Sequence, residues 1–586
     1  VTNTTSADTL TITSGADTTL ADVKAETLTS NAGGSITTDA IKADNADLTA
    51  SRNVSANGAI NADALTVAAG RNITTQSVAA KTADMTASGD VNVQGDLSGS
   101  ELDLSAGKNV TVSGTTSADT LTVAAGEDAT FAGVRAPLAN VSAGKRALLT
   151  DENNDMGVLN LSASTAVVRD SNDLTLNVQR MGDLDAATNG DLTATFGPAA
   201  NDVSLTSRGG AVDILTDVSA RNLTVSAKSS VQSRRNITAT NSVTLVSSGD
   251  VAAAGTVTTK DLTATAGESV TFAGPIAAKG DVALTSHNAS VLAEDVISAQ
   301  NLSIAAKENV STQREIDVAE KTTLAASNDI AAGGKITAGS LNVTAGKNAT
   351  IASAFVRDDL VGYAGEALNV QGDSETGGST WLAAHEISVR NLTAGKALTA
   401  LSETTFTGND LSAGDDVRVH TYGDMTFNDV TAGDDAWILG LGSSAARMKF
   451  HSVSARGLDT AVLLERGYMD YWKVTAALDG AAAVRHFDGP RLAGTLEQGS
   501  KIRVFYPYGG SLMPKDPFHF HVIDLLQNIE LLPFEREAVR MWPPRKPNLH
   551  VGSDDIDVNL GDYDYWLLEE PLNERELIKP LTVGEK

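Results

Sequence analysis

The chain has 586 residues, of which 41% are hydrophobic but only 4% aromatic, so small aliphatic side chains supply most of its apolar content. Such side chains fill a narrow core better than a wide one, which favours an elongated protein over a string of globular domains. The formal net charge of -29 excludes a general role on nucleic acid, and no apolar run is long enough for a helical membrane span.

The chain contains no Cys, which excludes disulfides and Cys-ligated metals. It begins at Val1 without an initiator Met and without a signal-peptide pattern. We therefore expect a mature or trimmed part of a longer precursor.

A repeated phrase runs from the first residues of the chain to beyond residue 430. Its general form is L-T-V-x-A-G-[KRE]-[ND]-V-T, as in ADALTVAAGRNIT (residues 62–74) and GSLNVTAGKNATI (residues 339–351). Its leading position recurs at unequal steps of 17 to 20 from Leu10 through Leu28, Leu48 and Leu65, and at steps of 19 or 20 after Leu223. This period is too short for repeats built from pairs of helices.

Leucine-rich repeats overlap this period, but they need a helical segment in each unit and an Asn at a fixed place after L-x-L. Here the second half of each unit reads ITTQSVAAKTADM or STQREIDVAEKTTL, with β-branched residues in alternation and Gly, Asn and Asp at the breaks. This pattern is typical of strands and turns. It predicts an all-β, right-handed parallel β-helix, or β-solenoid, of roughly 23 coils with about 19 to 20 residues per coil.

The repeat predicts a shaft over residues 1–457, with irregular coils or insertions at residues 144–220 and 355–390, where the phrase weakens. The composition changes after residue 457, since 14 of the 25 aromatic residues and ten of the 13 Pro lie beyond it. Residues 458–586 are therefore expected to form a smaller, aromatic-rich module. Its minimum role is to cap the last coil, because an open solenoid end exposes strand edges and core.

The phrase and its period resemble the repeats of filamentous haemagglutinin-type adhesins, the β-helical exoproteins of two-partner secretion. The resemblance covers about three quarters of the chain. It implies export across both Gram-negative membranes through an outer-membrane transporter, display on the bacterial surface, and adhesion to a host cell, a neighbouring cell or a glycan. The Asn-Pro-rich secretion domain that begins such exoproteins is absent from this sequence.

The tail GDYDYWLLEEPLNERELIKPL is the candidate partner-binding segment. On a strand, its large apolar side chains point to both faces and must be covered, either by the chain's own terminal module or by another subunit. The candidate residues are Tyr563, Tyr565, Trp566, Leu567 and Leu568.

Two clusters in the same region have chemical and structural interpretations. His519 and His521 would share one strand face and could contact a metal, but no third ligand is spaced to join them. The acidic stretch around Asp554 and Asp562 could bind Ca²⁺, yet it lacks the Gly and Glu of an EF-hand loop. A solvent-exposed strand face and a solvated acidic face are the alternatives, and we expect no metal or other cofactor.

Asn-x-Ser/Thr sequons are frequent, and they fit either glycosylation or turn Asn residues that precede β-branched strands. We expect the structural role. They include Asn53, Asn72, Asn109, Asn222, Asn236, Asn301, Asn342, Asn348 and Asn391.

The sequence favours a non-enzymatic extracellular or cell-surface fibrous protein whose shaft presents the C-terminal module. One alternative is a filament subunit whose C-terminal module docks head-to-tail onto the first coil of the next copy, giving a homopolymer. Another is a glycan-cleaving solenoid, which requires a clustered pair of carboxylates. Acids such as Asp90, Asp119 and Asp261 fall mainly at turns, where hydrogen bonding to the backbone is their expected role.

Overall fold

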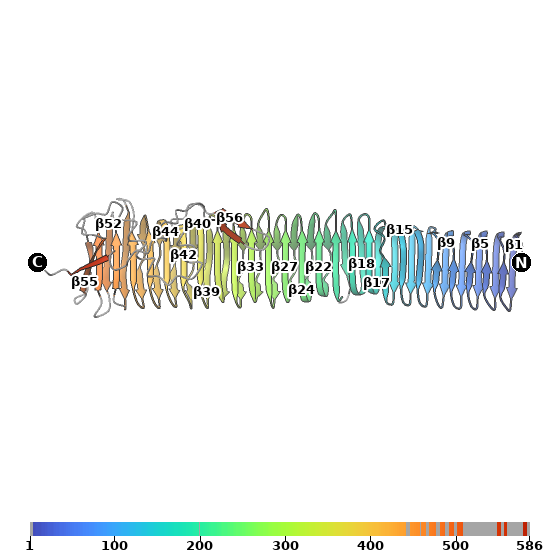
Figure 1. The fold of residues 1–586 in the computed structure, drawn as a ribbon, viewed down its shortest axis with the longest axis horizontal. Coiled ribbons are helices and arrows are strands. Elements are labelled where there is room, and N and C mark those ends of the chain that lie inside the picture. Colours follow the sequence, from blue (N-terminus) through green and yellow to red (C-terminus); the bar gives the residue numbers. More distant parts are fainter. Residues whose placement is uncertain are drawn as a thin grey trace. The chain divides into compact units, whose positions relative to one another are not determined.

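The computed structural model describes residues 4–197, 200–440 and 446–456 with their side chains, and beyond residue 456 it describes only the strands β51 to β58. The chain divides into two compact units, unit 1 (Val1–Gly267) and unit 2 (Glu268–Lys586). Both are built from parallel β-strands, and together they contain about 23 solenoid turns of about 19 residues (Figure 1). Every element of the described residues is a strand, which confirms the predicted all-β solenoid. The handedness of the winding stays a prediction.

Unit 1 is a stack of turns in which long strands alternate with short ones. Each strand pairs in parallel with the equivalent strand one turn later, as β5 pairs with β7 and β7 with β9. The strands are β1 (Thr5–Ser14), β2 (Thr18–Leu20), β3 (Val23–Ala32), β4 (Ile36–Thr38), β5 (Ile41–Ala50), β6 (Val54–Ala56), β7 (Ile60–Ala69), β8 (Ile73–Thr75), β9 (Val78–Ala87), β10 (Val91–Val93), β11 (Leu97–Ser98), β12 (Glu101–Ala106), β13 (Val110–Ser117), β14 (Thr120–Ala125), β15 (Ala129–Ala143), β16 (Arg146–Leu149), β17 (Asp155–Asp170), β18 (Leu174–Thr188), β19 (Leu192–Phe196), β20 (Asp202–Ser207), β21 (Val212–Ile214), β22 (Val218–Ala227), β23 (Ser230–Ser233), β24 (Ile237–Ser247), β25 (Asp250–Ala253), β26 (Val257–Thr259) and β27 (Asp261–Ala266).

Unit 2 begins with turns of three strands each, which form three parallel ladders, and its later turns merge some of these strands. The strands are β28 (Val270–Phe272), β29 (Ile276–Ala278), β30 (Asp281–Ser286), β31 (Val291–Ala293), β32 (Ile297–Ala299), β33 (Asn301–Ala306), β34 (Val310–Thr312), β35 (Ile316–Val318), β36 (Lys321–Ala326), β37 (Ile330–Ala338), β38 (Ser340–Ala345), β39 (Ala349–Val356), β40 (Leu360–Val370), β41 (Ser374–Thr376), β42 (Thr380–Val389), β43 (Asn391–Ala394), β44 (Leu398–Thr407), β45 (Asp410–Ala413), β46 (Val417–Thr421), β47 (Asp424–Thr426), β48 (Asp429–Ala432), β49 (Ala436–Gly440), β50 (Arg447–Ala455), β51 (Asp459–Leu464), β52 (Tyr468–Thr475), β53 (Ala481–His486), β54 (Leu492–Leu496), β55 (Lys501–Pro507), β56 (Asn548–Val551), β57 (Ile556–Asn559) and β58 (Ile578–Thr582).

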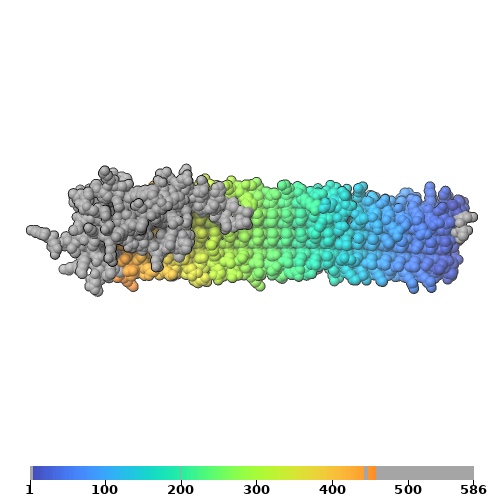
Figure 2. All heavy atoms as spheres, in the orientation of Figure 1, coloured from blue at the N-terminus to red at the C-terminus, as the bar shows by residue number. Residues whose placement is uncertain are grey.

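The repeated phrase corresponds to one long strand, one corner and one short strand. In residues 62–74 the apolar positions Leu65, Val67 and Ala69 point into the core, the corner follows at residues 70–72, and Ile73 starts the next strand. The polar residues between them point outwards, as the alternation of strand side chains requires. Figure 2 shows the resulting surface of unit 1 as rows of side chains that repeat from turn to turn.

The core of unit 1 contains two neighbouring inward columns on the long strands. Leu28 pairs with Ala46, whereas Leu48 pairs with Ser30, two positions further along. All four side chains are buried, so each of these turns places a large residue in one column and a small one in the other. Paired residues along one column are 18 or 19 positions apart here. The step of 20 residues from Leu28 to Leu48 in the sequence is therefore not the length of one turn, because the two residues belong to different columns.

The parallel ladder continues through residues 144–220 with turns of unequal length. Val158 pairs with Leu138 on one side and with Thr175 on the other, so the turn before Val158 is longer than the turn after it. In unit 2 the ladder also extends through β51, β53 and β55. The predicted boundary of a separate module at residue 458 stays a prediction, since the side chains beyond residue 456 lie outside the described part. In that described part, no helix has the length and apolar character of a membrane span.

Candidate functional site

Polar side chains at one corner of unit 1 form a ladder that runs from turn to turn. The carboxylate of Asp90 accepts hydrogen bonds from the backbone N–H of Asn109 (3.1 Å) and from its side-chain amide (2.9 Å). Asn109 Oδ1 in turn accepts from the N–H of Asp128 at 3.1 Å. Earlier in the same ladder, Asn72 Oδ1 accepts from the N–H of Asp90 at 2.8 Å. These side chains therefore satisfy backbone donors that the corner would otherwise leave unpaired.

Unit 2 repeats this arrangement at the equivalent corner. Asn309 Oδ1 accepts from the N–H of Asp329, and Asp329 Oδ1 accepts from the N–H of Asn348 at 3.1 Å. The structural role expected for Asp90 is confirmed, and the sequon residues Asn53, Asn72 and Asn109 have the same role. An Asn whose side chain is bound in this way is a poor acceptor for a glycan, because attachment would require the ladder to open.

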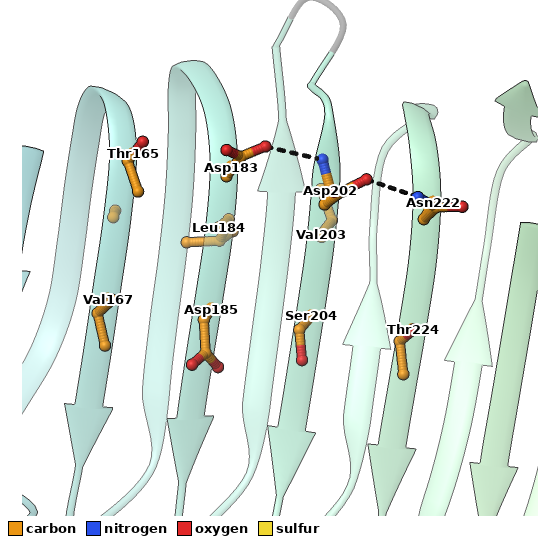
Figure 3. Close-up of a pocket in the computed structure, with 11 residues that line it drawn as sticks. Thr165, Val167, Asp183, Leu184, Asp185, Asp202, Val203, Ser204, Asn222 and Thr224 are labelled. Atoms are coloured by element: carbon orange, nitrogen blue, oxygen red, sulfur yellow. Dashed lines mark hydrogen bonds between the residues drawn. The ribbon is translucent and has the colours of Figure 1, made fainter. Parts of the chain in front are cut away.

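A shallow groove of about 400 Å³ lies on the outer surface of unit 1 and crosses the strands β17, β18, β20 and β22. Figure 3 shows its side chains in two rows that run across the strands. The first row contains Thr165, Asp183, Asp202 and Asn222, and the second contains Val167, Asp185, Ser204 and Thr224. The groove results from the register, because the residues in each row occupy the same outward position in successive turns.

The acidic groups of the groove are bound to neighbouring protein groups. Asp183 Oδ1 accepts from the N–H of Asp202 at 3.3 Å, and Asp202 Oδ1 accepts from the amide of Asn222 at 2.7 Å (Figure 3). The guanidinium of Arg221 also binds Asp202, and that hydrogen bond holds the pKa of the Asp202 carboxyl below its usual range. Arg169 pairs with Asp185, with 2.6 Å between Nη2 and Oδ2.

These contacts determine what the groove can do chemically. General acid catalysis of glycoside cleavage needs one carboxyl whose pKa is raised so that it carries a proton near neutral pH. The pKa of Asp202 is shifted in the opposite direction. The groove instead presents carboxyl groups and an amide, which are suited to bind hydroxyl groups or cationic groups of a ligand.

Among the side chains that the structure describes, one trio of carboxylates is close enough to share a cation: Asp416, Asp434 and Asp435. Asp416 already accepts a 2.8 Å hydrogen bond from Arg418 and a 3.0 Å hydrogen bond from the N–H of Asp435. We therefore assign no metal to this trio.

The candidate residues predicted from the tail lie outside the described residues, so their packing stays a prediction. They are Tyr563, Tyr565, Trp566, Leu567 and Leu568. The same holds for His519, His521, Asp554 and Asp562.

A feature that the sequence analysis missed lies on the outward face of β40, β42, β44, β46 and β49 in unit 2. In regular turns the second and fourth positions of the phrase L-T-V-x-A point outwards and are polar, as in Thr224 and Ser226. In these five strands all of these positions except Thr399 carry large or apolar residues, and most of the ten side chains are buried. The second positions are Val361, Trp381, Thr399, Arg418 and Trp437, and the fourth are Tyr363, Ala383, Leu401, His420 and Leu439.

We call these ten residues the outer aromatic face. Tyr363, Trp381, Ala383 and Leu401 form one buried cluster, against which Val361 packs. A signal was present in the sequence, because Trp and Tyr replace Thr and Ser at two fixed positions of the phrase after residue 360. From the repeat alone, residues 355–390 are predicted to form irregular coils or insertions, and no outer face is expected.

Comparison of the chain with protein-family models, with curated proteins and with solved structures finds no match in any of the three.

Proposed function

We propose that the chain is a non-enzymatic, adhesin-like fibrous protein of the extracellular space or the bacterial surface. One observation carries the proposal: the described corner carboxylates and amides bind backbone groups of adjacent turns, as Asp90 binds Asn109. Side chains used in this way build a scaffold. The resemblance of the repeat to filamentous haemagglutinin-type adhesins supports the same conclusion.

The groove on unit 1 is the proposed contact for a glycan or another ligand on a host or neighbouring cell. Its carboxyl groups and Asn222 offer acceptors and donors for sugar hydroxyls, and the groove is open to solvent along four turns.

Binding of the full chain to cells and to an array of immobilised glycans tests this role. The double variant Asp183→Ala with Asp185→Ala is expected to lose most of the binding, because it removes two of the groove's carboxylates. Asp47→Ala is the matched control, since Asp47 occupies the outward position of Asp185 on a strand of unit 1 that does not line the groove. Cleavage of a bound glycan would contradict the proposal and favour the enzymatic alternative.

We further propose that an outer-membrane transporter exports the chain, as the resemblance implies. Co-expression with an outer-membrane transporter of the two-partner type is expected to expose the chain to added protease on intact Gram-negative cells, and omission of the transporter is expected to keep it protected. Retention inside the cell in both conditions would contradict this route.

Head-to-tail filaments, in which the C-terminal module of one copy docks onto the first coil of the next, remain the second candidate. Concentration-dependent fibres in negative-stain electron microscopy would support a filament, and a monomer at all concentrations would exclude it.

A further inference from the structure

The side chains of the outer aromatic face of unit 2 point away from the solenoid core, yet most of them are buried. Successive side chains of a strand point to opposite faces of the sheet. In β46, Val417 and Val419 point into the solenoid core, so Arg418 and His420 point away from it, yet they are only 7% and 2% exposed. The outward Thr224 in unit 1 is exposed at the equivalent place. Other atoms of unit 2 must therefore lie over this face.

The burial extends across several turns in register. Trp381 pairs with Val361 in the preceding turn, and Leu401 pairs with Ala383 and His420. Trp381, Ala383 and Leu401 are 1 to 2% exposed, although each occupies an outward position. Burial of a Trp side chain together with its neighbours is strongly favourable, so the covering segment must present a large apolar surface of its own.

The path of the chain identifies a candidate for that segment. β58 pairs antiparallel with β55, with Phe505 opposite Pro580. Residues 508–577, between these strands, thus leave the last part of the parallel ladder and return to it. Both ends of this excursion are fixed within unit 2.

The excursion contains the required apolar sequence. In FHFHVIDLLQNIELLPF (residues 518–534), more than half of the positions are Phe, Val, Ile or Leu. Residues 508–547 also have ample length. β40 lies seven strand spacings from β55 along the ladder, which is about 34 Å at about 4.8 Å per spacing. When extended, a segment of this length reaches up to about 130 Å.

We propose that residues 508–547 fold back as a strap along the outside of the solenoid and pack on the outer aromatic face. The occupant is this segment of the same chain, whose covalent connection keeps it at a high effective concentration near the face. The face is then an intramolecular docking surface. Displacement of the strap would expose Trp381, Tyr363 and Leu401 together, as a large apolar patch.

Photo-crosslinking in the full-length chain tests the proposal. Tyr363→p-azidophenylalanine places a reactive group of similar size on the face, and Thr224→p-azidophenylalanine in unit 1 is the control. After illumination, mass spectrometry is expected to find cross-links within one chain from position 363 to residues 508–547, and none to that segment from position 224. Cross-links to a second copy, to residues 560–577 or to no part of residues 508–547 would overturn the proposal.

A charge on the face provides an independent measurement. Ala383→Arg places a cation where Ala383 is 2% exposed, and Thr224→Arg is the matched control. The first variant is expected to create new trypsin cleavage sites within residues 508–547, with the far-ultraviolet circular dichroism of the β-solenoid retained. Equal resistance of both variants and the parent chain to trypsin, with a folded solenoid, would contradict a strap at this place.

Discussion

Gly126 lies against the backbone carbonyl of Gly107, which occupies the same corner one turn earlier. The N–H of Gly126 donates a 2.9 Å hydrogen bond to the carbonyl of Ala106 and so holds the two corners together. A Cβ atom on Gly126 would overlap the carbonyl oxygen of Gly107. Glycine is thus required here by the close approach of two turns. Ser occurs at the same corner as Ser51 and Ser88, so the corner adapts in some turns.

Gly126→Ala is therefore expected to destabilise unit 1 by about 2 kcal/mol, because the neighbouring backbone must shift to admit the methyl group. Gly15→Ala is the matched control. Gly15 occupies the same corner in the first described turn, and a Cβ there meets no atom within 4 Å. The midpoints of urea unfolding compare the two variants, and equal midpoints would show that the contact between turns is unimportant.

Asn109→Ala should destabilise unit 1 by about 1 to 2 kcal/mol, because it leaves the backbone N–H of Asp128 without its acceptor and removes a donor from Asp90. Asn92→Ala is the control, since Asn92 points outwards from β10 and its side chain makes no hydrogen bond with a described residue. A loss of stability no greater than that of the control would mean that the ladder is not needed to hold the corner.

Thr75→Val is expected to stabilise unit 1 by about 1 kcal/mol. The Thr75 hydroxyl is fully buried and has no hydrogen-bond partner among the described residues, so its replacement by a methyl group removes a desolvation penalty. Val93 pairs with Thr75 in the next turn and is fully buried there, which shows that the column has room for Val. Thr74→Val, on the outward side of the same strand, should have little effect on the melting temperature.

Asp170 is expected to make the stability of unit 1 depend on pH. Burial raises the pKa of its carboxyl to about 6, although the backbone N–H groups of Asn172 and Met156 donate to it. Asp155 and Asp173 also raise this pKa through their charges. Because the pKa is raised in the folded state, the contribution to stability is fully present below about pH 3.8 and is lost as the pH rises through about 6.

Urea unfolding of the parent chain and of Asp170→Asn from pH 4 to pH 7.5 measures this contribution. The free energy of unfolding of the parent chain, relative to that of the variant, is expected to be higher at pH 4 than at pH 7.5 by up to about 3 kcal/mol. The variant Asp44→Asn serves as the control, because Asp44 is exposed on β5 and its charge is not among those that raise the pKa of Asp170. A difference that is independent of pH would show that Asp170 does not titrate in this range.

His420 should make the stability of unit 2 depend on pH in the opposite direction. Burial, followed by the charge of Arg418, lowers the pKa of His420 to about 3. The unfolded chain takes up a proton near pH 6.5 but the folded chain does not, so stability is lost as the pH falls from about 6.5 towards 3. His420→Leu is expected to abolish this loss, as measured by urea unfolding or by exposure of the outer aromatic face to a hydrophobic dye. An unchanged acid sensitivity would place its origin elsewhere.

The sequence alone determined the class of fold and much of the core. A short and nearly constant period, with alternating apolar positions and with Gly and Asn at the corners, allows only a coil built from strands. Leu223, Leu302 and Leu341 lie in the core as the phrase predicts. These features depend on neighbours within the same turn, or on equivalent positions of the next turn, which the repeat itself displays.

The tertiary structure decided which of two inward columns each large residue enters, and it separated Leu28 from Leu48. It also decided where a glycine is needed, because the contact of Gly126 with Gly107 joins different turns. The burial of Trp381 depends on atoms beyond its own ladder, and no local pattern encodes such a contact. The sequence reports the period of the solenoid, whereas contacts between its turns and over its outer face depend on how the whole unit packs.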